Sequence, residues 1–251
     1  MERFRGKSIV VTGAAGGIGA AICQRFASEG ALVCVADADI AGAESVARKI
    51  RAAGGQAEVR TFDLTNPAAI RSFVRGWTGA RRRIDVLCNN AGLMSRGALM
   101  ELTAEDWQQS FAVNVDALFH MCQAVIPVMQ DQGGGAIINT ASQWGIHPAP
   151  GHIAYNTTKA AVVAFTQNLA RDYAPDNIRV NGVAPGEIRT PMLESNLARS
   201  GRRLDDLNAL VPFGRIGEPD EVAALVAFLA SDEAQYLCGS VVEITGAQAV
   251  A

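Results

Sequence analysis

A short apolar segment that leads directly into a glycine-rich turn constrains the fold of this chain more than any other feature. Ser8-Ile-Val-Val11 has the character of a parallel strand buried on both faces. Thr12-Gly13-Ala-Ala-Gly16-Gly17-Ile18-Gly19 follows at once, and an amphipathic helical pattern then runs from Ala20 to Ser28. Strand, glycine turn and helix in this order predict the first unit of an open α/β sheet.

The glycine turn predicts a binding site for a dinucleotide. Glycines let the backbone approach a pyrophosphate closely, and the N-terminus of the helix supplies N–H donors and the positive end of its dipole. A tight turn without a ligand is the alternative interpretation. The candidate cofactor residues here are Thr12, Gly13, Gly17, Ile18 and Gly19.

Asp37 follows the second apolar segment, Leu32 to Ala36, and indicates which dinucleotide binds. A carboxylate at the end of this strand is placed to accept hydrogen bonds from an adenosine ribose, and its charge repels a 2′-phosphate. The glycine turn has no Lys or Arg, and none comes just after Asp37. NAD is therefore expected in preference to NADP. The alternative is a solvated turn residue or helix cap, a role for which Asp39 is also available.

The rest of the chain alternates between strand and helix patterns and predicts one doubly wound domain over residues 1–251. Further strands are expected at Ala57 to Phe62, Ile84 to Cys88, Gly135 onward, Ile178 to Val183 and Ser240 to Ile244; further helices are expected at Ile40 to Ala53, Pro67 to Trp77, Thr103 to about Gln130, Ala154 to Tyr173 and Pro219 to Leu229. Residues 187–211 are irregular and rich in charge, which favours a mobile lid over the substrate.

Composition excludes several classes of function. A net charge of −3 provides no basic field for nucleic acid, and the 49% hydrophobic content of 251 residues is enough for a large core. The five cysteines have no C-x-x-C spacing, so neither a metal site nor a disulfide framework is indicated. No signal sequence opens the chain and no uninterrupted apolar run is long enough to span a bilayer, so we expect a soluble, cytoplasmic protein without a membrane partner.

Tyr155 and Lys159 are the strongest candidates for chemistry. They lie four residues apart in a helical pattern and therefore share one face of the helix. A cation near a phenol favours the phenolate, so Lys159 is expected to lower the pKa of Tyr155. Ser142 follows the strand that starts at Gly135, and ligands bind at the carboxyl ends of such strands. The three side chains are therefore expected to meet.

Asn114 lies in the middle of a long helical pattern, where asparagine is unfavourable. Its amide can compete with the backbone and loosen the helix, which would free a carbonyl group to hold a water. A buried amide with all its hydrogen bonds made is the alternative.

The ordered set of motifs resembles the short-chain dehydrogenase/reductase family over nearly the whole chain. The motifs are Thr12-Gly13-x-x-x-Gly17-x-Gly19, Asp63-Leu64, Asn89-Asn90-Ala91-Gly92, Asn114, Ser142, Tyr155-x-x-x-Lys159, Asn181 and Pro185-Gly186. The resemblance implies a single Rossmann-type domain with a seven-stranded parallel sheet, NAD(P)-dependent interconversion of alcohols and carbonyls, and a homotetramer.

The resemblance also implies roles for single residues. Tyr155 would exchange a proton with the substrate oxygen, Ser142 would hydrogen-bond that oxygen, Lys159 would hold the nicotinamide ribose, and Asn114 would hold a water that links Lys159 to solvent. Further cofactor contacts are implied for Asp63, Leu64, Asn90, Ala91, Gly92, Pro185, Gly186, Ile188 and Thr190. One departure is Ile244-Thr245-Gly246-Ala247, which stands where the family commonly has Asp-Gly-Gly.

Polar residues around the expected site favour a small, hydroxyl-rich or anionic substrate such as a sugar, polyol or hydroxy acid. They are Arg96, Gln143, His147, His152, Glu187 and Arg189. Each arginine, taken alone, is more often a solvated loop charge or a member of a salt bridge. Reduction of a 3-oxoacyl thioester is the alternative activity, and a non-catalytic NAD-binding sensor is the alternative of another class.

The helices expected at Thr103 to Gln130 and Ala154 to Tyr173 are apolar on more than one face. This pattern favours pairing across a subunit interface and supports the homotetramer. Burial within one large subunit is the alternative.

Overall fold

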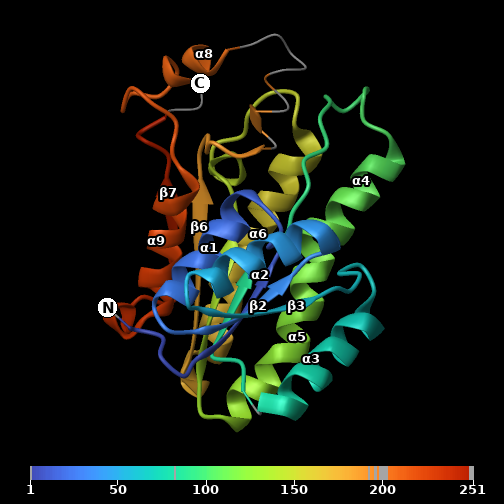
Figure 1. Cartoon of the computed structure of the whole chain (residues 1–251). Coiled ribbons are helices and arrows are strands. Elements are labelled where there is room, and N and C mark those ends of the chain that lie inside the picture. The colour runs from blue at the N-terminus through green and yellow to red at the C-terminus, as the bar shows by residue number, and fades with distance from the viewer. Residues whose placement is uncertain (1, 82, 192, 195–196, 198–202, 249–251) are drawn as a thin grey trace.

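The computed structural model describes residues 2–81, 83–191, 193–194, 197 and 203–248, and its centre is a parallel sheet (Figure 1). The seven strands lie in the order β3-β2-β1-β4-β5-β6-β7, and every neighbouring pair is parallel. They are β1 (Ser8–Thr12), β2 (Leu32–Ala36), β3 (Gln56–Arg60), β4 (Val86–Asn89), β5 (Gly135–Thr140), β6 (Ile178–Pro185) and β7 (Val241–Ile244). The predicted doubly wound sheet is confirmed.

Helices cover both faces of the sheet (Figure 1). The helices are α1 (Gly17–Ser28), α2 (Ile40–Ala52), α3 (Pro67–Arg81), α4 (Ala104–Phe111), α5 (Ala117–Asp131), α6 (Ile153–Tyr173), α8 (Leu204–Asn208) and α9 (Pro219–Ala230). Buried residues of α1, α2 and α9 form one apolar cluster, while those of α3, α5 and α6 form a second. Each layer is therefore held by its own core.

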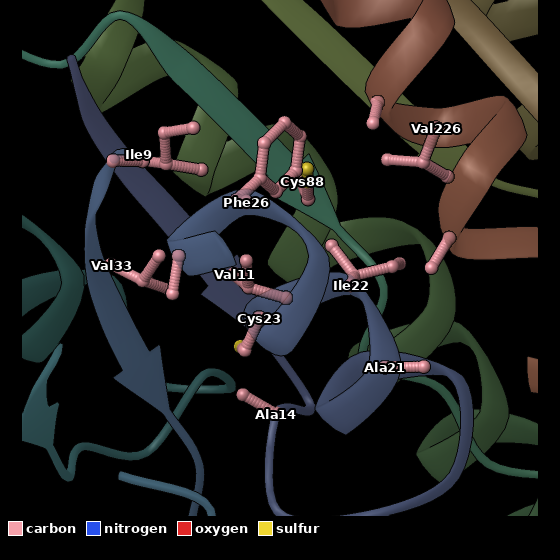
Figure 2. Packing of buried hydrophobic residues seen from close by; sticks show 14 of the residues in the cluster. Ile9, Val11, Ala14, Ala21, Ile22, Cys23, Phe26, Val33, Cys88 and Val226 are labelled. Atoms are coloured by element: carbon pink, nitrogen blue, oxygen red, sulfur yellow. The ribbon is translucent and has the colours of Figure 1, made fainter. Parts of the chain in front are cut away.

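The pleat of the central strand explains how both cores form from one short apolar segment. Side chains alternate between the faces of a strand, and Ile9 and Val11 join the first cluster whereas Val10 joins the second. Figure 2 shows Phe26 and Ile22 of α1 packed over the strands of the first cluster. An apolar segment with no polar face is what this doubly covered position requires.

The long helix after residue 103 is interrupted where the sequence predicts it. A π-helical turn, Ala112–Asp116, separates α4 from α5 and contains Asn114. Single π-helical turns often occur at functional sites. By length and hydropathy alone, Ala104–Asp131 would be long enough to cross a membrane, a property it shares with core helices of soluble proteins.

The order of strands reverses between β1 and β4, because the chain leaves β3 at one edge and returns to pair β4 with β1. In open α/β sheets ligands bind outside the carboxyl ends of the strands at this switch point. The glycine turn follows β1, Asn90 follows β4, and Ser142 lies two residues after β5. The fold thus brings the three motifs to one edge of the sheet.

The segment predicted as a lid, residues 187–211, lies partly outside the described residues. Within the described part, Leu207, Val211 and Ile216 form a small apolar cluster with Leu193, Leu197 and Leu204. Its mobility stays a prediction. All five cysteines are free, and four of them are buried.

Candidate active site

The glycine turn is packed so tightly that side chains are excluded from it. A Cβ atom on Gly19 would lie 2.0 Å from the carbonyl oxygen of Gly13, and one on Gly13 would lie 2.7 Å from the Cα atom of Ala91. Gly17 adopts a φ of 54°, which favours glycine. A Cβ atom on Gly16, the N-cap of α1, would meet nothing within 4 Å, so the start of the helix is open for the close backbone approach that a pyrophosphate needs.

Asn90 and Thr12 lock the segment after β4 against this turn. The Asn90 side-chain amide donates to the carbonyl oxygens of Thr12 at 3.1 Å and Gly13 at 3.0 Å. In return, the Thr12 hydroxyl accepts the backbone N–H groups of Asn90 at 3.1 Å and Ala91 at 3.2 Å. The two motifs, far apart in sequence, therefore form one rigid wall of the site.

Asp37 lies beside the glycine turn. Its Oδ2 accepts the N–H of Ala15 at 2.8 Å, and its Oδ1 accepts the N–H of Asp39 at 2.9 Å. The N-cap of α2 is Asp39, whose side chain accepts the N–H of Gly42. The side-chain cap of α2 is therefore supplied by Asp39 rather than Asp37, and the half-buried Asp37 carboxylate is fixed next to the turn.

Asp63 and Leu64 differ in their surroundings. Asp63 is exposed, and its Oδ1 accepts the N–H of Thr65 at 2.8 Å and the Thr65 hydroxyl at 2.7 Å. These hydrogen bonds lower the pKa of Asp63. Leu64 packs inward and lines a small cavity together with Thr12 and Ala91, behind the glycine turn.

Lys159 is buried at the carboxyl end of β5. Its Nζ donates to the carbonyl oxygen of Thr140 at 2.7 Å and lies 5.7 Å from the centre of the Tyr155 ring. Burial lowers the pKa of Lys159 to about 8, because it disfavours the charged ammonium. A Cβ atom on Gly92 would lie 3.3 Å from this Nζ, so the glycine leaves room beside the amine.

The pKa of Tyr155 departs from the sequence prediction. Burial raises it, the nearby charge of Glu187 raises it further, and a hydrogen bond with Ser142 opposes both effects. The prediction that Lys159 lowers the pKa of Tyr155 is wrong for this arrangement. The physical reason is that both groups are desolvated, while the Lys159 ammonium is directed to Thr140 O.

Ser142 is held by a short 3-10 turn, Gln143–Gly145, for which it is the N-cap. Its Oγ accepts the N–H of Trp144 at 3.2 Å. The Trp144 ring lies edge-on to Tyr155, with the ring centres 6.0 Å apart. A Cβ atom on Gly145 would lie 2.5 Å from the carbonyl carbon of Lys159, so the turn is packed directly on α6. Trp144 and Gly145 fix the Ser142–Tyr155 pair, and no sequence signal had singled them out.

The side-chain amide of Asn114 has all its partners. Its Oδ1 accepts the N–H of Leu93 at 2.9 Å, while its Nδ2 donates to Leu93 O and to the Thr158 hydroxyl, both at 2.9 Å. The two interpretations of Asn114 are therefore compatible, because the amide is satisfied and the helix is nevertheless locally a π-helix. Its role in holding a water stays a prediction.

The segment after β6 lies opposite the glycine turn. A Cβ atom on Gly17 would lie 3.1 Å from the Cγ2 atom of Thr190. Ile188 is buried, and Gly186 donates its N–H to Ile244 O at 3.0 Å. The residues after Pro185 thus close the crevice on the side of Gly17.

Among the substrate candidates, His152, Gln143 and Glu187 are close to Ser142 and Tyr155. The His152 ring packs on Trp144 with ring centres 4.5 Å apart, and its Nδ1 is bonded to Pro150 O at 2.8 Å. Its Nε2 is buried without a hydrogen-bond partner. Gln143 is the neighbour of Ser142 in the chain, and the charge of Glu187 acts on Tyr155.

The remaining substrate candidates are Arg96, Arg189 and His147. Arg96 is exposed on the loop whose Gly97 pairs with His152. Arg189 forms a salt bridge with Glu194 at 3.1 Å, and His147 lies 3.3 Å from Glu243 of β7. Arg189 and His147 are thus engaged by carboxylates, whereas the Arg96 guanidinium is open to solvent.

Comparisons with known proteins agree with this geometry. Residues 13–246 match the family model described as enoyl-(acyl carrier protein) reductase. The chain is 38% identical to a 3-oxoacyl-(acyl-carrier-protein) reductase of Thermotoga maritima over 97% of this chain and 98% of the relative. It is 37% identical to the D-threitol dehydrogenase of Mycolicibacterium smegmatis over 97% of this chain and 93% of the relative. The crystal structure of L-sorbose reductase from Gluconobacter frateurii, complexed with NADPH and L-sorbose, superposes with a TM-score of 0.93 at 31% identity and covers 99% of this chain and 98% of that chain.

Proposed function

The chain belongs to the short-chain dehydrogenase/reductase family, and from this membership we propose that it is an NAD-dependent dehydrogenase of small polar alcohols. The family acts on CH–OH groups with a nicotinamide cofactor, so the reaction class is that of an oxidoreductase. The proposal adds the choice of NAD and the class of substrate, a sugar, polyol or hydroxy acid.

The observation that carries the proposal is the meeting of Ser142, Tyr155 and Lys159 at the carboxyl end of β5. Two hydroxyl groups share a hydrogen bond beside a buried amine with a shifted pKa. A non-catalytic NAD-binding sensor has no physical need for such a group, since perturbed pKa values in a cleft are typical of catalytic sites.

These residues suit proton exchange with a substrate oxygen. A bound nicotinamide supplies the hydride acceptor or donor for the carbon atom. The raised pKa keeps the Tyr155 phenol protonated at neutral pH, which suits proton donation to a carbonyl oxygen. In the oxidation direction the deprotonated phenol takes the alcohol proton, and Ser142 holds the same oxygen by a hydrogen bond. The buried amine of Lys159 lies 5.7 Å from the centre of the phenol ring.

The residues present fit a dinucleotide. The glycine turn excludes side chains at the start of α1, and the Asp37 carboxylate is fixed on its flank. Ala38, which follows Asp37, offers no cation for a 2′-phosphate. This supports NAD as the preferred cofactor, although the related L-sorbose reductase was crystallised with NADPH.

Polar groups near Tyr155 support a hydroxyl-rich substrate. His152 presents a buried Nε2 without a partner, and Glu187 contributes a carboxylate close enough to raise the Tyr155 pKa. Relatives named for D-threitol and L-sorbose act on a polyol and a sugar. A substrate with several hydroxyl groups would supply a hydrogen-bond partner for the Nε2 atom of His152.

Reduction of a 3-oxoacyl thioester is the second candidate, because of an apolar groove next to the site. The groove is lined by Ala98, Leu99, Pro148, Ala149, Pro150, Gly151, Ile153, Asn156 and Thr157. It could accommodate an acyl chain, and the 38% identical relative is a 3-oxoacyl reductase. The charge of Asp37 opposes this candidate, since that activity in the family usually uses NADPH.

Initial rates decide between the two candidates. NADH formation is followed with polyols, sugars, hydroxy acids and long apolar alcohols, and the consumption of NADPH and NADH is followed with a 3-oxoacyl thioester. We expect the highest kcat/KM for a polyol, sugar or hydroxy acid with NAD. A higher kcat/KM for the thioester or for the apolar alcohols would overturn the substrate proposal, and no turnover of any compound would favour the sensor.

We also propose a homotetramer. Trp107 of α4 and Phe119 of α5 are 37% and 44% exposed, on the helices whose outer faces the sequence assigns to a subunit interface. Aromatic side chains are enriched in the cores of interfaces, and closed symmetry is usual for soluble homo-oligomers.

A further inference from the structure

Gln143 has a buried polar atom that nothing in the described protein satisfies. The side chain is only 2% exposed. Its Nε2 donates to Oε1 of Gln248 at 3.1 Å, while its own Oε1 is buried and has no hydrogen-bond partner. An unpaired buried acceptor costs about 1 to 3 kcal/mol, so such an atom calls for a partner.

This Oε1 atom lies at the border of the active site. It would be 3.1 Å from a Cβ atom built on Gly186, the residue that follows β6. Gln143 itself follows Ser142, whose hydroxyl is bonded with Tyr155. The free acceptor therefore lies between the catalytic hydroxyl groups and the segment that closes the crevice.

The backbone around Gln143 leaves its side chain little freedom. Its carbonyl oxygen accepts the N–H groups of Ile146 at 3.0 Å and His147 at 2.7 Å. The same turn is packed on α6 through Gly145. Because the side chain is also buried, the main remaining freedom is rotation of the terminal amide, which would exchange Oε1 and Nε2.

Gln248 is the side-chain partner of the Gln143 amide, and it comes from the C-terminal turn, residues 245–248. Gly246 and Ala247 adopt φ values of 61° and 62°, and the N–H of Gln248 donates to Thr245 O at 3.2 Å. The turn is held from outside as well, because the N–H of Phe213 donates to Gly246 O at 3.1 Å. This segment is where the sequence departs from the Asp-Gly-Gly of the family.

We propose that Gln143 selects substrates carrying a second hydroxyl group next to the reacting carbon, and that Gln248 is its positioning residue. Gln248 holds Nε2, so Oε1 is left to accept the hydrogen bond of that hydroxyl. An alcohol without it leaves the acceptor unpaired, and sites built to hydrogen-bond a substrate group reject analogues that lack it. The inference rests on the proposed function and names the feature that the substrate must have.

The test compares kcat/KM for 2,3-butanediol and 2-butanol, which differ only in the second hydroxyl. For Gln143→Leu we expect the diol-to-monoalcohol ratio to fall by about tenfold, as the loss of one hydrogen bond to a buried group predicts. Gln248→Leu frees the amide and lowers the ratio in the same direction. Gln248→Glu leaves only acceptor oxygens to face Nε2 and retains the wild-type ratio.

Two controls separate a loss of substrate selection from damage to the fold. Gln56→Leu makes the same change at an exposed position of the edge strand β3 and leaves the ratio unchanged. The KM for NAD is measured for each variant and stays at the wild-type value, because Oε1 is assigned to the substrate and not to the cofactor.

An unchanged ratio in Gln143→Leu overturns the inference, and so does a rise in the KM for NAD that accompanies the fall in the ratio. A Gln248→Glu variant that behaves as Gln248→Leu overturns the role of Gln248. Failure of the proposed function looks different, since the wild type would then turn over neither alcohol nor any other member of the panel.

Discussion

The ammonium group of Lys159 donates to the carbonyl oxygen of Thr140, and it lies 5.7 Å from the centre of the Tyr155 ring. The amine is thus anchored to the end of β5 while the phenol is bonded to Ser142. Both groups are desolvated, and burial favours the neutral form of each. It therefore raises the pKa of Tyr155 and lowers the pKa of Lys159. At neutral pH the Tyr155 phenol is therefore neutral, while the Lys159 amine, with a pKa of about 8, is still mostly protonated.

Replacement of Tyr155 by Phe removes only the hydroxyl that exchanges the proton. We expect NADH affinity to stay at the wild-type level and kcat to fall by a factor on the order of 10² or more, the usual contribution of a positioned acid/base. Fluorescence titration with NADH and steady-state rates measure the two quantities. A kcat near that of the wild type would contradict the role of Tyr155.

Oxidation should become faster as pH rises, because the reaction needs the deprotonated phenol. Since the pKa of Tyr155 is raised, the increase continues into the alkaline range, and reduction shows the opposite trend. The profile belongs to the coupled pair of Tyr155 and Lys159. Single-turnover rates across the pH range test this, and a chemical step independent of pH would argue against the mechanism.

Lys159→Met should abolish turnover and yet stabilise the fold at neutral pH. A shift from 10.5 to about 8 corresponds to roughly 3 kcal/mol against folding while the amine is charged. The lost hydrogen bond to Thr140 O offsets about 1 kcal/mol of the gain. Between pH 8 and pH 10.5 the unfolded chain binds the extra proton, so wild-type stability rises with pH there and the advantage of the variant shrinks.

Thermal or urea unfolding of both proteins at several pH values measures this difference in the free energy of unfolding. A Lys159→Met variant that is less stable than the wild type at pH 7, by an amount independent of pH, would show that burial of the ammonium is not costly.

The double substitution Asp37→Ser with Ala38→Arg should shift the preference toward NADP, because it removes a negative charge and adds a partner for the 2′-phosphate. Affinity for both cofactors should also fall somewhat, since Asp37 holds the N–H of Ala15. The ratio of kcat/KM for NAD and NADP measures the effect. Asp39→Ser is the matched control, because Asp39 caps α2 and the preference should not change. A wild type that uses NADPH better would disprove the role given to Asp37.

The purified protein should have the mass of a tetramer, about 106 kDa, which is four times 26.4 kDa. Light scattering at micromolar concentration measures it. Phe119→Lys places a charge on the exposed outer face of α5 and should lower the mass, while a monomeric mass for the wild type would refute the assembly.

Periodicity and turn chemistry predicted the fold because they are local properties of the chain. The apolar residues of β1 indicated burial on both faces, and the helix predicted from Pro67 begins there, where Oδ1 of Asn66 accepts the N–H of Ala68 at 2.9 Å. Asn114 marked the interruption of the long helix by the same kind of reasoning. These signals concern a few neighbouring residues, which is why the sequence contains them.

The relationships that the sequence did not predict join residues far apart along the chain. The hydrogen bond between Gln143 and Gln248 spans 105 residues, and that between Lys159 and Thr140 spans 19. No periodic pattern encodes such a pairing. The direction of the Tyr155 pKa shift was missed for a related reason, since spacing along a helix places the cation but does not report how far water is excluded.

The π-helical turn at Ala112–Asp116 has a consequence for changes in chain length. In an ordinary α-helix, one residue fewer or more rotates everything downstream by about 100°, whereas a π-helical turn takes up one extra residue without that rotation. In α5, Leu118 and Met121 are buried while Phe119 is half exposed. Deletion of a single residue from this turn would therefore restore an ordinary helix and leave Leu118 and Met121 of α5 on the buried face. Such a deletion would remove the local π-helical geometry around Asn114, while α4 and α5 would keep the faces that they now present.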